Sequence, residues 1–439
     1  MNAKKATLRG PERFVRDEEG GMLAYGLTAL LGMLIFGGLA VDVGNAYAVR
    51  THLAIAADSA AHAAIYTREL QSEDVAKQRA LEVFEVALPP EQYGTILTVD
   101  DIEFGTWDEA TRVFTPSPYS KQAVRVLAER SSQRNNSVGT FLLGLAGLDS
   151  WDVRRDSIFQ TYMPTCLREG FVAEEIVDVQ SNNAYTNGFC IHSNTHVEVN
   201  QSNYFAENTI VSMPDRSDLV LPESGFESND GLAEALRDGA YRLRILDRLA
   251  EIMEGLDDPS SGYMPDYIVS SVPIELPSRN VSDADFTPGR IHTYTCSGPH
   301  KLKVANGSFL NEIVIDTNCP VELGQGTILD NAIIATSNTT VDSISAPAQV
   351  QIGRDDNCAP DGGAQLVTLG GISFPSQMRV YGGQMLAMDD IEFSAEANGI
   401  EGASFISGGT ISGTSNMTMG FCGSGMEDNF EASYFRLTG

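Results

Sequence analysis

The sequence predicts an α+β protein: a transmembrane helix that continues into a long helix, a small antiparallel sheet, and a mostly β domain folded as a parallel β-solenoid with an inserted helix. Three observations predict this fold. An uncharged apolar run covers residues 22–41, β-type alternation begins near residue 96, and glycine or acidic pairs recur every 19 residues near the C-terminus. The predicted parts are residues 1–21 (tail), 22–43 (transmembrane helix), 44–163 (helix and sheet) and 164–439 (β-rich domain, with a helical insertion at 230–256).

The apolar run from Met22 to Val41 is the first element. It holds 20 residues, which span about 30 Å as a helix, the thickness of a bilayer's hydrocarbon core. A cleaved secretory signal is the alternative, but its apolar region usually has about 7–15 residues. Here the run is longer and the helical pattern continues beyond it. We therefore expect a retained anchor in contact with the lipid bilayer.

The basic residues around this run predict its orientation. After the run, Arg50 is the only basic residue within a comparable distance. Five basic residues precede the run: Lys4, Lys5, Arg9, Arg13 and Arg16. Cytoplasmic flanks carry the excess of lysine and arginine. The short N-terminal tail is therefore expected in the cytoplasm, and the rest of the chain on the far side.

A motif flanks and overlaps the apolar run. Its residues are Phe14, Arg16, Asp17, Glu18, Gly20, Ala40, Val41, Asp42, Gly44, Tyr47, Arg50, Leu53, Ala56, Ala57, Asp58, Ser59, Ala60 and Ala61. This segment of about fifty residues resembles the N-terminal part of the TadE/TadG-like proteins of the bacterial tight-adherence (Flp) pilus-assembly system. It departs from them at Ser59 and His62. It also lacks a glutamate five residues after Gly20 or Gly21, which argues against cleavage there and against incorporation into a fibre as a pseudopilin.

The resemblance implies a location, an architecture and a role. It implies a single-pass protein of the bacterial inner membrane with a periplasmic body, a pilin-like helix-and-sheet domain, and other pilus-assembly envelope proteins as partners. The implied role is a non-enzymatic anchor or scaffold in pilus biogenesis and adhesion. The residues expected to serve membrane anchoring and helix packing are Gly20, Ala40, Asp42, Gly44, Tyr47, Ala48, Arg50 and Asp58.

Small residues recur every four positions along the predicted helix, which is expected to run unbroken to about Ala87. One set is Ala40, Gly44 and Ala48, and a second is Ala56, Ala60 and Ala64. Small side chains allow another helix to approach closely. The stripe is thus compatible with a homo-oligomer formed through the N-terminal helix. For the second set, packing within the chain is an equal alternative.

Charge and cysteine content describe the exported part. The net charge is −30, with 16 basic and 21 acidic residues up to residue 163, and 13 basic and 38 acidic residues after it. This balance excludes nucleic acid as a partner, because binding it requires clustered basic residues. Six cysteines in an oxidising compartment indicate disulfides, whose pairing the sequence leaves open. The cysteines are Cys166, Cys190, Cys296, Cys319, Cys358 and Cys422. Cys166 and Cys190 have almost the same separation as Cys296 and Cys319, which hints at two local bridges.

Short strands and turns rich in glycine and asparagine fill much of the chain after Cys166. The pairs Gly370-Gly371, Asp389-Asp390 and Gly408-Gly409 are 19 residues apart. A repeat near twenty residues is typical of a parallel β-solenoid, in which each coil stacks on the next. A β-sandwich is the alternative. Between two solenoid-like parts, leucines at three-and-four spacing predict a helix from Asp230 to Gly255. A short apolar helix is also expected earlier in the chain, over residues 137–148.

The chain carries none of the sequence motifs that mark common catalytic or cofactor sites. We expect no enzymatic activity, cofactor or metal. The strongest enzymatic alternative is a membrane-tethered glycan-binding or glycan-cleaving β-helix protein, whose acid–base groups would be Asp355-Asp356 and Asp389-Asp390. Both pairs lie at turn-like positions, where aspartate commonly stabilises the turn.

Overall fold

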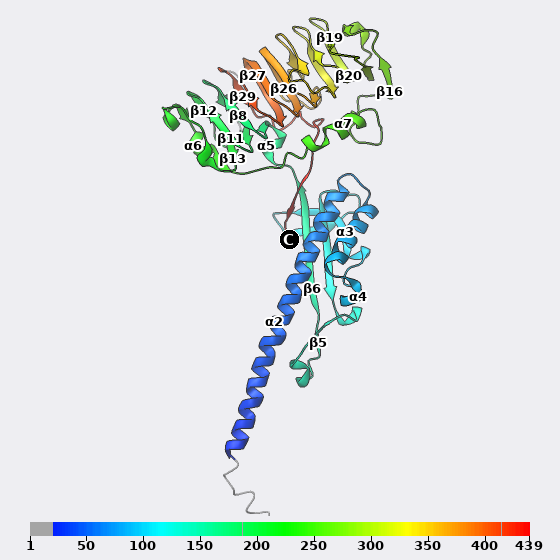
Figure 1. The fold of residues 1–439 in the computed structure, drawn as a ribbon, viewed down its shortest axis with the longest axis vertical. Coiled ribbons are helices and arrows are strands. Elements are labelled where there is room, and N and C mark those ends of the chain that lie inside the picture. The colour runs from blue at the N-terminus through cyan, green and yellow to red at the C-terminus, as the bar shows by residue number, and fades with distance from the viewer. Residues whose placement is uncertain (1–20, 187, 414) are drawn as a thin grey trace, which may run out of the picture. The chain divides into compact units, whose positions relative to one another are not determined.

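The computed structural model describes residues 21–186, 188–413 and 415–439. It forms two compact units, drawn in Figure 1. Unit 1 comprises the chain up to Tyr162 together with Ser433–Gly439, and unit 2 comprises Met163–Ala432. Gly20 and the residues before it in the predicted tail lie outside the described residues, and Gly21 already belongs to the first helix.

Unit 1 is organised around helix α2 (Gly21–Arg68), which has 48 residues. Its N-terminal half exposes large apolar side chains: Met22, Ile35 and Phe36 are 90%, 59% and 76% exposed. The helix is long and apolar enough to cross a membrane. It is therefore consistent with a membrane anchor or a signal sequence. Its exposed apolar side chains are either surrounded by lipid, as in an anchor, or cleaved from the protein, as in a signal.

The C-terminal half of α2 packs into the core of unit 1. Ala56, Ala60 and Ala64 are at most 1% exposed, so this set of small residues serves packing within the chain. They allow close approach of α3 (Glu73–Ala87) and of the sheet, both of which contact α2.

The unbroken helix predicted up to Ala87 is wrong. Helix α2 ends at Arg68, and α3 begins after a short turn. Ser72 caps α3 by accepting a hydrogen bond from the backbone N–H of Val75 at 3.5 Å. Acidic residues in the first turn favour a new helix start. The break lets α3 fold back and bury Phe84 against α2.

Five antiparallel strands form the sheet of unit 1, in the order β2-β1-β3-β6-β30. They are β1 (Ile102–Asp108), β2 (Val113–Pro116), β3 (Ala123–Arg130), β6 (Val153–Tyr162) and β30 (Tyr434–Leu437). The first four lie in the segment predicted to be β-rich. β30 was assigned with residues 164–439 to the other domain, and this is corrected: Tyr434 pairs with Tyr162, and Leu437 pairs with Phe159.

A two-stranded hairpin extends from this sheet. It consists of β4 (Val138–Gly139) and β5 (Ser150–Trp151), with one 3₁₀ turn, η4 (Leu143–Ala146), between them. The sequence pattern predicted a short apolar helix over residues 137–148, which is wrong. Gly139, Gly144 and Gly147 interrupt the helical pattern, and the backbone N–H of Thr140 bonds the carbonyl of Asp149 at 3.0 Å to close the loop.

Unit 2 is a parallel β-solenoid, as predicted, and its stacked coils are visible in Figure 1. The strands of its first arm are β7 (Gly170–Ala173), β8 (Ile176–Val179), β9 (Ala184–Tyr185), β10 (Cys190–Ser193), β11 (His196–Val199), β12 (Asn203–Phe205), β13 (Ile210–Met213), β14 (Asn229–Asp230) and β15 (Leu236–Asp238). The strands of its second arm are β16 (Ser270–Glu275), β17 (Asn280–Val281), β18 (Arg290–Tyr294), β19 (Leu302–Val304), β20 (Phe309–Thr317), β21 (Val321–Glu322), β22 (Ile328–Thr336), β23 (Ile344–Ser345), β24 (Gln351–Ile352), β25 (Ala364–Thr368), β26 (Ile372–Ala387), β27 (Ile391–Ser407), β28 (Ile411–Ser412) and β29 (Thr418–Gly420).

The two arms join at the middle of the stack. In the first arm, β7, β10, β13 and β15 stack in chain order. The second arm stacks from β16 towards β27, and β27 then pairs with β7. The last coil of the chain therefore lies directly on the first coil. Both ends of unit 2 meet at the centre of the solenoid.

An asparagine ladder runs along one corner and crosses this joint. Asn183 and Asn203 are each 2% exposed, and Asn229 is 1% exposed. The side-chain oxygen of Asn203 accepts the N–H of Asn183 at 2.9 Å, and that of Asn229 accepts the N–H of Asn203 at 3.1 Å. Across the joint, Asn183 accepts the N–H of Met417 at 2.9 Å. Each buried amide thus satisfies the backbone of a neighbouring coil.

Three disulfides fasten the coils: Cys166–Cys190, Cys296–Cys319 and Cys358–Cys422. The first two are the local bridges at which the spacing hinted. The third joins residues 64 apart and ties the chain after the last coil to an earlier coil. In the chain-entropy account, closing a loop of that size stabilises the fold by about 4 kcal/mol.

A segment over residues 239–269 connects the end of the first arm to the start of the second. The single helix predicted from Asp230 to Gly255 is wrong. Only α6 (Leu232–Ala235) and α7 (Leu249–Gly255) are helical, and β14 and β15 belong to the solenoid. The leucine spacing reflects burial rather than one helix, because α7 packs against β25 and buries Ile252.

Asp330 gives the solenoid a predicted pH dependence. It is 8% exposed, and its nearest cation is Arg354, whose Nε lies 3.9 Å from its Oδ1. Burial, together with Asp356 and Glu312, raises the pKa of Asp330 despite the attraction of Arg354. Ionisation of this group therefore costs stability. The cost is absent below the unfolded pKa of about 3.9 and grows as pH rises through the folded pKa.

Asp330→Asn is expected to raise the melting temperature of unit 2 at pH 8 and to leave it unchanged near pH 3, since the charge is removed only where it exists. Arg354 keeps Asp356, at 3.2 Å, as a partner. Thermal unfolding followed by circular dichroism across this range measures the effect. The exposed Asp355→Asn is the matched control. A variant that melts below the wild-type chain at pH 8 would contradict this account.

Candidate functional site at the anchor–head junction

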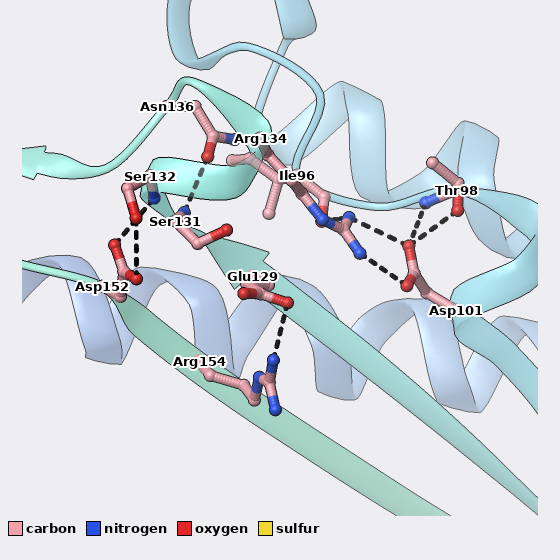
Figure 2. Close-up of polar contacts among 10 residues, drawn as sticks. All are labelled: Ile96, Thr98, Asp101, Glu129, Ser131, Ser132, Arg134, Asn136, Asp152 and Arg154. Atoms are coloured by element: carbon pink, nitrogen blue, oxygen red, sulfur yellow. Dashed lines mark hydrogen bonds and ion pairs between the residues drawn. The ribbon is translucent and has the colours of Figure 1, made fainter.

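A polar network fixes the loop that leads from β3 to the β4–β5 hairpin, and Figure 2 shows it. Arg134 donates to Asp101 at 2.6 Å and to the carbonyl of Ile96 at 2.7 Å. Asp101 also accepts the N–H of Thr98 at 2.8 Å. Burial opposes the ionisation of Asp101, but Arg134 and Thr98 outweigh it and hold the pKa of Asp101 below its ordinary value. The network is thus a stable ion pair at neutral pH.

Further hydrogen bonds hold the two sides of the hairpin base. The side-chain oxygen of Asn136 accepts the N–H of Ser131 at 2.8 Å, and Asp152 accepts the N–H of Ser132 at 2.7 Å. The first contact closes the loop that follows β3, and the second joins this loop to the residue just before β6 (Figure 2). The hairpin therefore projects from a fixed base.

The hairpin tip is bound to the membrane-type helix through Asp42. This residue ends the apolar run and is 2% exposed. Its carboxylate accepts three consecutive backbone N–H groups, from Phe141 at 2.6 Å, Leu142 at 3.0 Å and Leu143 at 2.7 Å. A carboxylate at the start of a helical turn satisfies amides that have no partner within the turn. Asp42 is the contact that attaches the hairpin to the end of the apolar run in α2.

Gly38, one turn before Asp42, permits the same contact. It is buried, and a Cβ placed on it would lie 2.8 Å from the Cβ of Leu142. The hairpin backbone can approach α2 only because this position carries no side chain. The close approach and the carboxylate cap together fix the hairpin along α2.

A groove of about 270 Å³ lies beside this junction. Helix α2 contributes Val43, Tyr47 and Arg50, β5 of the hairpin contributes Trp151, and β6 contributes Arg154, among others. Arg154 is paired with Glu129 at 3.0 Å. Arg50 is exposed and has no hydrogen-bond or ion-pair partner among the described residues. The groove combines aromatic and cationic groups at the end of the apolar run.

The structure places the other residues expected for anchoring and packing outside this contact. Ala40, Gly44 and Ala48 lie on an exposed face of α2, and nothing described comes within 4 Å of a Cβ built on Gly44. Asp58 is half-buried farther along the helix.

One carboxylate of each pair considered for glycan chemistry holds a turn of the solenoid. Asp356 accepts the N–H of Ala359 at 2.9 Å, and Asp390 accepts the N–H of Thr410 at 2.7 Å. Each of these carboxylates has a structural partner. Asp355, at the first of these turns, is exposed.

The hydrogen-bond partners of Asp42 could not be predicted from the sequence, because they lie 99 to 101 residues away along the chain. One signal was present: an acidic residue ends an otherwise uncharged run. A carboxylate at such a place is rarely left without a partner.

Comparisons with known proteins match two parts of the chain. Residues 170–423, which cover the solenoid, match the family described as Domain of unknown function (DUF7867). Residues 20–71, which cover most of α2, match the Flp pilus-assembly TadE/G-like family. No curated protein and no solved structure matches the chain.

Proposed function

Because this chain belongs to the DUF7867 family over its solenoid and carries a TadE/G-like segment at its start, we propose that it is a membrane-anchored, non-enzymatic component of a tight-adherence (Flp) pilus assembly system. In this role it spans the inner membrane once through α2, with its N-terminus in the cytoplasm. The remainder of unit 1 and the whole of unit 2 lie in the periplasm, where they anchor or scaffold other envelope proteins of the system.

The junction at Asp42 is the observation that carries this proposal. A cleaved signal is removed and needs no contact with the mature protein. Here the end of the apolar run is bonded to the head through three backbone N–H groups. Cleavage before Asp42 would remove Gly38, on which Leu142 packs, and cleavage after Asp42 would remove the carboxylate that holds the hairpin. Both considerations support a retained anchor.

The disulfides and the charge of unit 2 support its export. All six cysteines are paired, and such bonds persist in oxidising compartments. The role proposed for unit 2 is binding of other proteins rather than chemistry, since one carboxylate of each suspected pair, Asp356 and Asp390, holds a turn. The exposed face at Ala40, Gly44 and Ala48 is suited to a neighbouring helix, either of a second copy or of a partner.

A complementation experiment tests the proposal. Deletion of the gene is expected to abolish or strongly reduce Flp piliation and surface attachment, counted by electron microscopy and by an adhesion assay. The full chain should restore both. A chain in which a cleavable signal replaces residues 1–43 should be exported but should fail to restore them. Normal piliation in the deletion strain would overturn the proposal.

A further inference from the structure

The hairpin tip over residues 140–148 is apolar, and it exposes Phe141 and Leu148, whereas Leu143 is buried. It contains no charged residue and includes Phe141, Leu142, Leu143 and Leu148. Phe141 is 68% exposed and Leu148 is 55% exposed. In water, such side chains on the tip of a projecting loop would cost free energy without any compensating contact. The loop therefore needs a partner.

The attachment point of the loop sets its depth relative to the anchor. Asp42 ends the apolar run, and Leu142 touches α2 at Gly38, which lies three residues inside the run. At ~1.5 Å per residue, this contact is about 5 Å inside the hydrocarbon end of the span. Next to it, α2 itself exposes Leu39 and Val41 by 48% and 51%. The apolar surface of the loop is thus continuous with that of the anchor.

From this placement we propose that the hairpin tip inserts into the outer (periplasmic) leaflet of the membrane that α2 spans, as a second membrane contact beside the anchor. The inference rests on the proposed membrane anchoring of α2. It adds that the head lies against the bilayer surface and is partly embedded in it, rather than standing off on a helical stalk.

The backbone of the tip is already prepared for an apolar environment. Unsatisfied amides are costly in lipid. Asp42 accepts the N–H groups of residues 141–143. Within the loop, the N–H of Gly147 bonds the carbonyl of Gly144 at 3.0 Å, and that of Leu148 bonds the carbonyl of Leu143 at 3.1 Å. In the same way, the hairpin shields the Asp42 carboxylate, which would otherwise face lipid.

The base of the hairpin has the composition of a membrane interface. Trp151 is the last residue of the second hairpin strand, β5. It lines the groove beside the hairpin together with Tyr47 and Arg50 of α2. Tryptophan and tyrosine collect at the headgroup level, and a basic side chain there meets lipid phosphate. Arg50, exposed and unpaired among the described residues, is placed for such a contact. Insertion is expected to place the apolar tip in the hydrocarbon region and the aromatic base at the headgroup level, and the hairpin has its apolar and aromatic residues in this order.

Depth measurement in the full chain tests the proposal. The protein is reconstituted in vesicles of phosphatidylethanolamine and phosphatidylglycerol, with an environment-sensitive NBD probe on a single added cysteine in Leu148→Cys. Nitroxides on the lipid acyl chains are expected to quench this probe at least twofold more than a probe in Tyr119→Cys. Tyr119 is 92% exposed, and nearby Lys121 bonds the carbonyl of Glu69 near the far end of α2.

A third probe, in Phe36→Cys, separates this inference from the anchor itself. Quenching at residue 36 with none at residue 148 would overturn the insertion and leave the anchor standing. No quenching at residue 36 would overturn both. Quenching at both positions, with none at residue 119, supports insertion.

The two native tryptophans give a second measurement that leaves the hairpin unmodified. The chain has only Trp107 and Trp151. Trp107→Phe leaves Trp151 as the single reporter at the hairpin base, and Trp151→Phe leaves Trp107. Trp107 and Ile158 both come within 3.3 Å of a Cβ built on Gly439. Ile158 lies five residues along β6 from Val153, or roughly 17 Å, so Trp107 is far from the hairpin base. Headgroup-level nitroxides should quench Trp151 and spare Trp107. Equal quenching of the two would contradict insertion.

Discussion

Replacing Phe405 with alanine is expected to destabilise unit 2 by about 3–5 kcal/mol, the range for truncation of a buried phenylalanine. Phe405 is fully buried. Its ring stacks on that of Phe171, with centroids 5.1 Å apart, and meets the edge of Phe393 at 5.2 Å. Phe405 pairs in register with Phe171. The substitution therefore opens a cavity at the joint between the last coil and the first.

The position of this cavity predicts where the fold loosens. For a domain of this size, the loss corresponds to a fall in melting temperature of roughly 6–20 °C. Hydrogen exchange should rise first in β27 and β7, on both sides of the joint. Phe309→Ala is the matched control, because Phe309 lies in the same solenoid and is 50% exposed. Equal melting temperatures for the two variants would show that the joint is not a point of special sensitivity.

Removing the carboxylate of Asp42 is expected to release the hairpin from α2. In Asp42→Ala, the N–H groups of Phe141, Leu142 and Leu143 lose their acceptor together. Amide exchange over residues 140–149 should accelerate at least tenfold in the full chain held in a membrane mimetic, whereas the β1–β3 pairing should stay protected. Piliation should fall as well, if the head must be held at the membrane.

Two further variants make this test specific. Asp42→Asn keeps one side-chain acceptor oxygen and is expected to give an intermediate exchange rate. Asp58→Ala removes a half-buried acid from the same helix and should leave the hairpin protected. Unchanged exchange in Asp42→Ala would show that the packing of Leu142 on Gly38 suffices to hold the loop.

The coil repeat could be predicted from the sequence because it is local. Corner pairs 19 residues apart correspond to coils that stack in register, so Ile372 pairs with Ile391 and Ile391 pairs with Ile411. The period gives the length of a coil. It carries no information on which coil stacks on which, so the pairing of β27 with β7 could not be predicted. The pairing of β30 with β6 could not be predicted either, because a local repeat carries no information on contacts between distant parts of the chain.

The helical region shows a second limit. Continuous apolar periodicity predicted one helix up to Ala87, yet a single serine cap at Ser72 was enough to end α2 and start α3. The apolar hairpin was predicted as a helix because its leucines have helical spacing. The site depends on the second of these corrections, since Asp42 was expected to serve anchoring and helix packing and its partners lie in the hairpin.

The meeting of both chain ends at the central coils has a mechanical consequence. The two connections to unit 1 leave that unit side by side, since Tyr162 pairs with Tyr434. They enter unit 2 at neighbouring coils, which pair through β7 and β27. Tension along both connections would reach the middle of the stack first, so neither outermost coil would be peeled off one layer at a time. Such a body would resist extension by shearing a broad ladder of hydrogen bonds.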